Sequence, residues 1–187
     1  MWGIYPIMVI MDAVIAKIEE PDRYMSELLH FVFEIYRSTN GAYPRMEWLS
    51  EKPRTDDFYS FARAYGEFLN FRLKGEFDEL YLLLAPNIAG TFALVYRFEG
   101  KNIPWFPEDI KNNCVFLEFF MVHPSHQGKG FGHRMLSLAM RKARELGKDL
   151  CVVTFEDLPA YTYYLKRGFR PIRKDGTFVT LILETSK

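Results

Sequence analysis

The sequence predicts one mixed α/β domain in which helices cover a β-sheet. Its 187 residues are enough for a single domain with a sizeable core. Hydrophobic residues make up 49% of the chain and charged residues 26%, as in ordinary globular proteins. Segments with strand and helix periodicity alternate without an internal repeat or a low-complexity linker. The domain is therefore expected to span residues 1–187, with residues 1–10 as an optional apolar extension.

The N-terminal half is predicted to contain helices and strands in alternation. Apolar residues recur at helical spacing up to Asn40-Gly41, a dipeptide typical of a helix end. Thr55 or Asp56 is expected to cap a second helix. The predicted elements are a strand over 10–18, helices over 21–38 and 55–74, and strands over 80–85 and 91–98.

The C-terminal half contains clearer signals for loops and turns. Pro104 and Pro107 indicate a loop over 100–113. Asp175-Gly176 indicates a hairpin turn. The predicted elements are strands over 115–122, 150–155, 169–172 and 178–183, and helices over 130–146 and 159–166.

A glycine-rich turn lies between the apolar run at 115–122 and the helical pattern that follows. Its sequence is Gln127-Gly128-Lys129-Gly130-Phe131-Gly132. A strand that leads into such a turn at a helix N-terminus is a site for phosphate. Glycines allow close backbone approach, the first N–H groups of the helix have no helical partner, and the helix dipole favours an anion. The Walker pattern GxxxxGK[ST] is missing, so the turn does not indicate a nucleotide-binding P-loop.

Two motifs resemble those of the GNAT superfamily of N-acetyltransferases. The turn, which follows Val122-His123-Pro124, matches the family's [QR]xxGx[GA] segment. The stretch from Ala160 to Phe169 is similar to its AxxxYxxxGF segment. Both occur in the family's order and at its separation. The resemblance covers roughly residues 79–183 and implies a mixed, mostly antiparallel central sheet flanked by helices.

The resemblance also implies an activity and its cosubstrate. Family members pass the acetyl group of acetyl-CoA directly to an acceptor amine and need no metal. Carried onto this chain, backbone N–H groups of Gln127–Gly132 hold the pyrophosphate. Backbone groups of Phe120, Met121 and Val122 pair with the pantetheine arm, as an added strand does. A bulge is implied to open the strand that ends at Val122 from the strand that begins at Leu150.

Tyr164 aligns with the tyrosine of the second motif, four residues before Gly168. In the family this hydroxyl donates a proton to the departing thiolate. A phenol has a pKa of about 10 and is therefore a proton donor at neutral pH. The alternative is an aromatic side chain that only packs a short helix. Tyr163 is adjacent, so an error of one residue in the alignment would exchange the two.

Glu118 is the only ionisable side chain in the run 115–122. An alkylamine has a pKa near 10.4, so its neutral form costs roughly 4–5 kcal/mol at pH 7 and a base assists the reaction. Family members often place a carboxylate on this strand. Glu118 is thus a candidate base, and a salt-bridged carboxylate at the strand edge is the alternative reading.

The acceptor is expected to enter beside the helices of residues 21–74 and the loop 100–113. These segments carry many aromatic and acidic residues, which suit a cationic amine but equally a packed core or a homodimer interface. A small amine, a peptide N-terminus and a protein lysine all fit. A non-catalytic acetyl-CoA sensor is the rival hypothesis. Asp157 keeps it open, because many family members carry at that position an Asn that contacts the cofactor arm.

Composition and charge indicate which binding partners and which cellular location to expect. The formal net charge is zero, so no basic field indicates nucleic-acid binding. Two cysteines suggest a reducing, cytoplasmic location and a free core thiol at Cys151. Residues 1–10 are too short for a membrane span and lack the basic start of a signal peptide. His123, His126 and His133 lack zinc-like partners in the sequence, so no metal site is expected.

Overall fold

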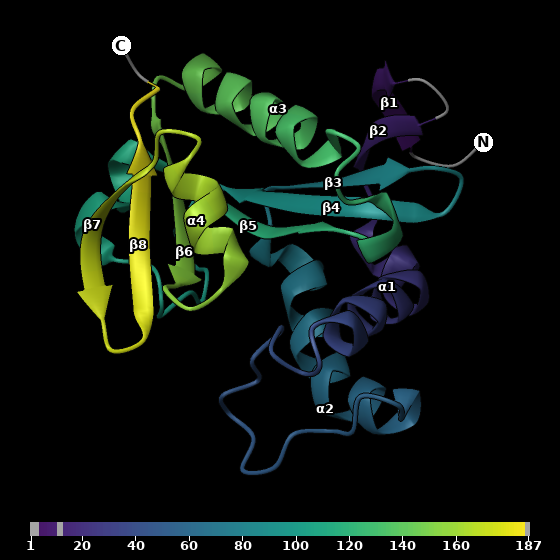
Figure 1. Ribbon diagram of the computed structural model, residues 1–187. Coiled ribbons are helices and arrows are strands. Elements are labelled where there is room, and N and C mark those ends of the chain that lie inside the picture. The colour runs from purple at the N-terminus through teal and green to yellow at the C-terminus, as the bar shows by residue number, and fades with distance from the viewer. Residues whose placement is uncertain (1–3, 11–12, 186–187) are drawn as a thin grey trace. The chain divides into compact units, whose positions relative to one another are not determined.

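The computed structural model describes residues 4–10 and 13–185. The chain divides into two compact units, one of Met1–Phe92 with Phe120–Gly132 and one of Ala93–Phe119 with His133–Lys187. The prediction of a single domain stays a prediction. Each unit has its own strands, helices and buried core, and Figure 1 labels the elements.

The first unit contains an antiparallel sheet and two long helices. Its elements are β1 Ile4–Ile10, β2 Ala13–Ile18, α1 Met25–Ser38, α2 Phe58–Phe71, β3 Glu79–Leu84 and the beginning of β4 Ile88–Val95, with helical turns at Pro21–Tyr24 and Arg72–Glu76. The pairs β1/β2 and β2/β3 are antiparallel, and β4 lies next to β3.

The single strand predicted over 10–18 is wrong, because the structure has two strands there. Ile10 pairs with Ala13 across residues 11 and 12, which lie outside the described residues. Residues 4–10, expected as an extension, form β1. Asp12 is the only turn-favouring residue between the two strands, and the apolar pattern on both sides of it concealed the chain reversal.

The N-cap of helix α2 lies one residue after Asp56 and two residues after Thr55, the two predicted caps. The Asp57 carboxylate accepts a hydrogen bond from the Ser60 N–H at 3.0 Å, which makes Asp57 the N-cap. The Asp56 carboxylate instead pairs with Arg54, whose Nη2 lies 2.7 Å from Asp56 Oδ2. The α1 and α2 helices pack through aromatic rings, among them Tyr36 against Phe61 at 5.1 Å between centroids.

The second unit confirms a mixed sheet. Its elements are the first part of β5 Cys114–Val122, α3 Phe131–Glu145 from His133 onward, β6 Asp149–Phe155, α4 Pro159–Leu165, β7 Arg170–Asp175 and β8 Phe178–Leu183, with a helical turn at Glu108–Asn113. The strand order is β5-β6-β8-β7. The β5/β6 pair is parallel, and the β6/β8 and β7/β8 pairs are antiparallel. The predicted mostly antiparallel sheet flanked by helices is therefore confirmed.

The free thiol predicted at Cys151 is wrong. Cys114 and Cys151 form a disulfide between β5 and β6, with their Cα atoms 6.0 Å apart, and both residues are buried. They are 37 residues apart in the sequence, and only the parallel register brings them together. The inference of a reducing compartment depended on free thiols and loses that support. None of the helices in the described part of the chain is long and apolar enough to cross a membrane.

Candidate functional site

Strand β5 pairs with β6 at its beginning and has an irregular backbone further along. It pairs with β6 through Cys114–Asp149, Val115–Leu150 and Phe116–Cys151. Three residues further on, Phe119 has a φ of 56°, a left-handed conformation that costs an L-residue about 1–2 kcal/mol. Such an irregularity is the local distortion that a β-bulge introduces. It lies in the strand for which the resemblance implied a bulge.

Beyond Phe119, exposure alternates along β5. Phe120 and Val122 are half-buried, whereas Phe119 and Met121 are buried. Successive side chains of a strand point to opposite faces. One face of this end of β5 is therefore packed and the other is partly open. Phe120, Met121 and Val122 are the residues that were expected to pair with the pantetheine arm.

The turn after β5 is held by backbone hydrogen bonds. The His123 N–H donates to the Ala89 carbonyl at 2.8 Å and fixes the end of β5 on β4. A helical turn over Pro124–His126 follows, in which the His126 N–H donates to the His123 carbonyl at 2.8 Å. The Gln127 N–H donates to the Pro124 carbonyl at 3.3 Å. The glycine-rich segment therefore starts from a fixed point.

Two glycines of the turn adopt a conformation that favours glycine. Gly128 has a φ of 76° and Gly130 a φ of 80°. A Cβ atom built on either would meet no protein atom within 4 Å. Backbone conformation, and not crowding by the described protein atoms, is thus what calls for glycine here. The space beside the turn is open, which suits a bound ligand.

One of the backbone N–H groups expected to bind the pyrophosphate already has a partner within the protein. The Gln127 N–H already has a partner, and the Gln127 side chain donates to the Val122 carbonyl at 3.3 Å. Gln127 therefore joins the turn to β5. The N–H groups from Gly128 to Gly132, at the start of α3, are the better candidates for an anion.

Tyr164 is held firmly within the second unit. It is 6% exposed and packs against Phe169 at 5.2 Å between ring centroids. Its carbonyl accepts the N–H groups of Arg167 at 2.9 Å and Phe169 at 3.2 Å, where α4 ends and Gly168 has a φ of 90°. The AxxxYxxxGF segment thus forms a helix end that fixes the tyrosine.

Glu118 lies one residue before the left-handed Phe119. Its side chain is half-buried, although Leu117 and Phe119 on either side are buried. This position avoids the large cost of burying an isolated carboxylate. The role of Glu118 as a base stays a prediction.

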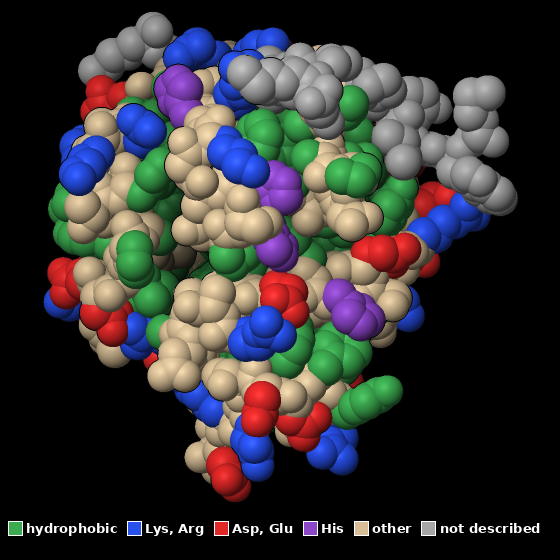
Figure 2. All heavy atoms as spheres, turned by 45° about the vertical axis from the view of Figure 1, so that its right-hand side comes forward, with side chains coloured by type: hydrophobic (Ala, Val, Ile, Leu, Met, Phe, Trp, Pro, Cys, Tyr) green, Lys and Arg blue, Asp and Glu red, His purple; other side chains and the backbone are tan. Residues whose placement is uncertain are grey.

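The sequence reasoning missed a polar cluster at the same turn. The Ser125 hydroxyl lies 2.8 Å from His123 Nδ1 and 2.9 Å from His126 Nδ1. The sequence signal was the pattern His-Pro-Ser-His, in which a hydroxyl sits between two imidazoles. On the face drawn in Figure 2, histidine side chains lie against one another. Among the described residues no group of three or more His, Cys, Asp or Glu could hold a metal ion.

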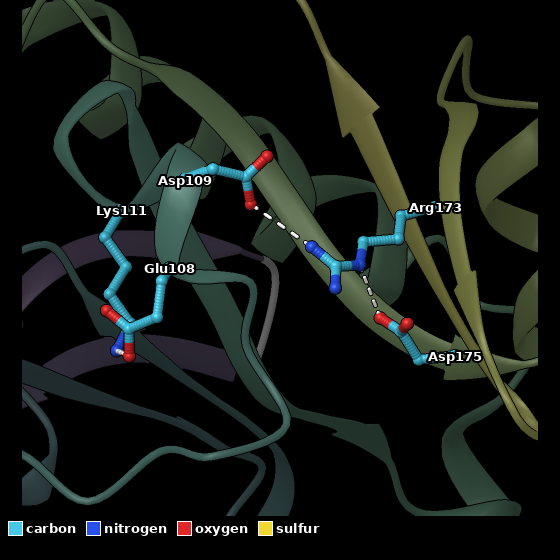
Figure 3. A network of polar contacts seen from close by, with 5 residues as sticks. All are labelled: Glu108, Asp109, Lys111, Arg173 and Asp175. Atoms are coloured by element: carbon cyan, nitrogen blue, oxygen red, sulfur yellow. Dashed lines mark hydrogen bonds and ion pairs between the residues drawn. The ribbon is translucent and has the colours of Figure 1, made fainter.

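The loop 100–113 forms a groove with β7. The groove measures about 400 Å³ and is lined by residues 104–109 with Arg173 and Asp175. Arg173 joins its two walls, with 3.3 Å to Asp109 and 2.6 Å to Asp175 (Figure 3). Lys111 pairs with Glu108 in the same loop. Aromatic and acidic side chains therefore meet here, but these carboxylates already have cationic partners.

Comparison with known proteins gives the family. The model of the Acetyltransferase (GNAT) family matches residues 29–169. A candidate acetyltransferase from Pyrococcus horikoshii is 47% identical, with 90% of this chain and 96% of that chain covered and a TM-score of 0.75. No curated protein matches the chain in sequence.

More distant structures share the fold. The PaiA N-acetyltransferase of Thermoplasma acidophilum, solved with coenzyme A, is 17% identical, covers 90% of this chain and 97% of its own, and has a TM-score of 0.60. An acetyltransferase of Thermus thermophilus is 18% identical, with 94% and 99% covered and a TM-score of 0.61.

The chain belongs to the GNAT acetyltransferase family, since the family model matches more than half of its length. It is an acyl-CoA-dependent acetyltransferase.

Proposed function

We propose that the chain is an N-acetyltransferase that passes the acetyl group of acetyl-CoA directly to an amine. The observation that carries this proposal is the left-handed glycine turn at the end of β5. It follows a strand with a left-handed residue at Phe119 and it starts a helix, as an anion-binding turn requires. Coenzyme A in the PaiA enzyme supports the same cosubstrate here.

The proposed cosubstrate site uses backbone groups. The N–H groups from Gly128 to Gly132 bind the pyrophosphate, and Gln127 keeps the turn attached to β5. The backbone of Phe120, Met121 and Val122 pairs with the pantetheine arm on the partly open face of the strand. These contacts place the thioester for attack, and such placement contributes a large part of the rate.

In the proposed reaction the amine nitrogen attacks the thioester carbonyl, and the C–S bond breaks. The departing thiolate takes its proton from the Tyr164 hydroxyl, and the acceptor nitrogen loses one proton to a base. Glu118 is the proposed base. The fixed position of Tyr164 at the end of α4 supports the donor role, because a general acid must be held within reach of the proton it transfers.

The acceptor is proposed to be an amine, either a small molecule, a peptide N-terminus or a lysine side chain. The aromatic residues that line the groove of residues 104–109 with β7 support a cationic acceptor. A cytoplasmic location and a homodimer stay predictions from the sequence.

A thiol-release assay tests the proposal. Acetyl-CoA is offered with polyamines, amino acids, aminoglycosides and short peptides, and free coenzyme A is measured. Release with one class establishes N-acetyl transfer and its acceptor type. If acetyl-CoA raises the melting temperature but no acceptor yields thiol, the sensor hypothesis gains.

Tyr164→Phe then tests the proton donor, with Tyr163→Phe as its matched control. Loss of the proton donation lowers kcat by about 10²- to 10⁴-fold, while coenzyme A affinity stays unchanged. Tyr163→Phe keeps near wild-type turnover. The reverse result, with Tyr163→Phe inactive and Tyr164→Phe active, would move the role to the neighbouring tyrosine.

A further inference from the structure

A hydroxyl group lies between two imidazoles in the turn that precedes the glycine-rich segment. Ser125 Oγ is 2.8 Å from His123 Nδ1 and 2.9 Å from His126 Nδ1, which are ordinary hydrogen-bond distances. The Ser125 N–H donates to His123 Nδ1 at 3.3 Å and caps this helical turn. A ring N–H of His126 donates to the Ala85 backbone. The protons of the cluster must therefore satisfy all of these contacts at once.

Two neutral imidazoles cannot satisfy every contact. A neutral imidazole has one N–H group and one acceptor nitrogen, and a serine hydroxyl has one proton to donate. His126 uses its N–H for Ala85, so its Nδ1 accepts the Ser125 hydroxyl proton. His123 Nδ1 then faces Ser125 Oγ with a lone pair, which repels the oxygen, or with a proton, which opposes the Ser125 N–H. Either tautomer of His123 leaves one unfavourable contact.

A second proton on His126 removes this conflict. The His126 Nδ1–H then donates to Ser125 Oγ, while the other ring N–H still donates to Ala85. The Ser125 hydroxyl rotates and donates to His123 Nδ1, which also accepts the Ser125 N–H. Every contact of the cluster then joins a donor to an acceptor. The geometry thus favours the doubly protonated, positively charged form of His126.

His126 lies where a positive charge acts on the glycine-rich turn. Its ring centroid is 6.1 Å from that of Phe131, the first residue of α3, so the two ends of the segment 127–130 lie close together. The N–H groups proposed to bind the pyrophosphate belong to this segment and to the first residues of α3. The charge of Lys129, in the same segment, acts on His126. A charge on His126 therefore acts in turn on an anion bound there.

The surroundings oppose this charge in the free protein. The pKa of the His126 imidazole is lowered by its partial burial and then by the positive charges of Lys129 and of protonated His123, which outweigh the Ala85 hydrogen bond. Ala85 on the β3–β4 hairpin and Phe131 on α3 carry no charge. His126 is therefore mainly neutral at neutral pH, and the cluster keeps its unfavourable contact.

Helix α1 supplies no opposite charge to the cluster. It packs against the turn, and the ring centroid of Phe31 lies 6.2 Å from that of His123. The titratable side chains of α1 nearest to Phe31 in the sequence have other partners: Glu34 pairs with Arg37, Glu27 acts on Tyr24, and His30 Nδ1 lies 2.9 Å from the Ser26 carbonyl. Among the described residues, the charges that act on His126 are positive.

We propose that His126 takes up a proton when the cosubstrate binds, an inference that rests on the proposed function and its cosubstrate site. The pyrophosphate brings negative charge to the turn and offsets the charges of Lys129 and His123. His126 then takes a proton from water at Nδ1, and the Ser125 hydroxyl rotates from His126 to His123. The completed network fixes the start of the glycine-rich segment. His126 is thus a positioning residue and takes no part in the transfer step.

The proposal predicts that acetyl-CoA binds more tightly as the pH falls. The complex holds the His126 proton more firmly than the free protein, so affinity is lowest above both pKa values of this group and highest below both. The phosphomonoester of coenzyme A also titrates near pH 6, so the wild type is compared with His126→Gln. Between about pH 8 and about pH 5.5 the wild type should gain about 3- to 10-fold more affinity than the variant, as fits a charge interaction at a partly exposed site.

Calorimetry on the intact protein measures the proton itself. Acetyl-CoA is titrated into the wild type and into His126→Gln, each in two buffers of different ionisation enthalpy, and the difference in heat gives the protons taken up. The glutamine amide keeps a donor for Ala85 and does not titrate. The wild type should take up a fraction of a proton more than the variant. Equal proton uptake in the two proteins would overturn the proposal.

Variants of two neighbouring residues separate the network from its surroundings. Ser125→Ala removes the acceptor of the His126 Nδ1–H and should reduce the proton uptake and raise the KM for acetyl-CoA, with kcat unchanged. Ser125→Thr keeps a hydroxyl and should retain both. His133→Gln, which removes an exposed imidazole in the first turn of α3, is the matched control and should leave the uptake unchanged. Full uptake in Ser125→Ala, or loss of uptake in His133→Gln alone, would overturn the proposal.

The calorimetry distinguishes failure of this proposal from failure of the proposed function, because it contains no acceptor. Binding of acetyl-CoA without proton uptake at His126 overturns the proposal and leaves N-acetyl transfer untouched. Proton uptake at His126 in a protein that releases no thiol with any acceptor supports the proposal for cosubstrate binding and overturns N-acetyl transfer.

Discussion

The two halves of β5 are similar in composition and differ in what surrounds them. Its first residues, Cys114–Phe116, are buried, lie in parallel register with β6 and carry a disulfide. Its last residues, Phe120–Val122, follow the left-handed Phe119, have one partly open face and end in a glycine turn. One strand thus contains a buried segment that pairs with β6 and a segment that is proposed to bind the cosubstrate.

The difference shows how a sheet can provide a binding strand. A fully paired strand has no backbone groups to offer, because its neighbours satisfy them. A left-handed residue changes the direction of the chain at a cost of about 1–2 kcal/mol, and here it follows the residues of β5 that pair with β6. The buried first half supplies stability that offsets this cost. Substitutions in the first half should therefore affect unfolding, and those in the second half should affect coenzyme A.

Removing the disulfide should give the largest change. The double variant Cys114→Ala with Cys151→Ala is expected to lower the free energy of unfolding by about 2–4 kcal/mol, because the bond closes a long loop in the unfolded chain. Chemical denaturation measures this. Coenzyme A affinity under native conditions should not change. Reductant should destabilise the wild type and leave the double variant unaffected, and equal sensitivity of the two would contradict the disulfide.

A valine in the glycine-rich turn should instead weaken the binding of coenzyme A. Gly130→Val forces a β-branched residue into a left-handed conformation, at a cost of about 1–2 kcal/mol, which equals about 5- to 30-fold in affinity if the turn rearranges. Calorimetry with coenzyme A measures the loss. Gly147→Val imposes similar backbone strain at the end of α3, where φ is 65°, and should leave affinity unchanged. Unaltered affinity in Gly130→Val would remove the turn from the site.

Glycine and alanine substitutions at Phe119 and Phe116 should give the smallest of these effects and should differ in their order of stability. Phe119→Gly should be less destabilising than Phe119→Ala by about 1 kcal/mol, since glycine adopts a positive φ freely. At Phe116, in regular strand, the order reverses, and glycine is worse than alanine by about 0.5–1 kcal/mol. Urea midpoints of the four variants test this. The same order at both positions would mean that β5 is regular throughout.

Much of the fold could be predicted from sequence because its elements carry local signals. The strand at β5, the helix after the glycine turn and the hairpin at Asp175-Gly176 lie within a few residues of their predicted positions. Failures occurred where the deciding contact is not local. The β1–β2 reversal is marked in the sequence by Asp12 alone, and the disulfide joins two strands that only the parallel register brings together.

The site could be predicted as a set of motifs but not as a geometry. The glycine turn and Tyr164 have signatures in the sequence. The left-handed Phe119 has none, because phenylalanine carries no preference for a positive φ. The use of the Gln127 N–H within the turn, and the contact of Ser125 with two imidazoles, arise from the Pro124–His126 helical turn and became visible only in three dimensions.

Hydrogen exchange with and without coenzyme A tests the account most directly, because it reports on both halves of β5 in one experiment. Coenzyme A is predicted to slow exchange of the amides from Phe120 to Gly132 and to leave Cys114–Phe116 unchanged. Protection confined to other segments, or equal protection of both halves of β5, would contradict the assignment of this strand end and its turn to the cosubstrate.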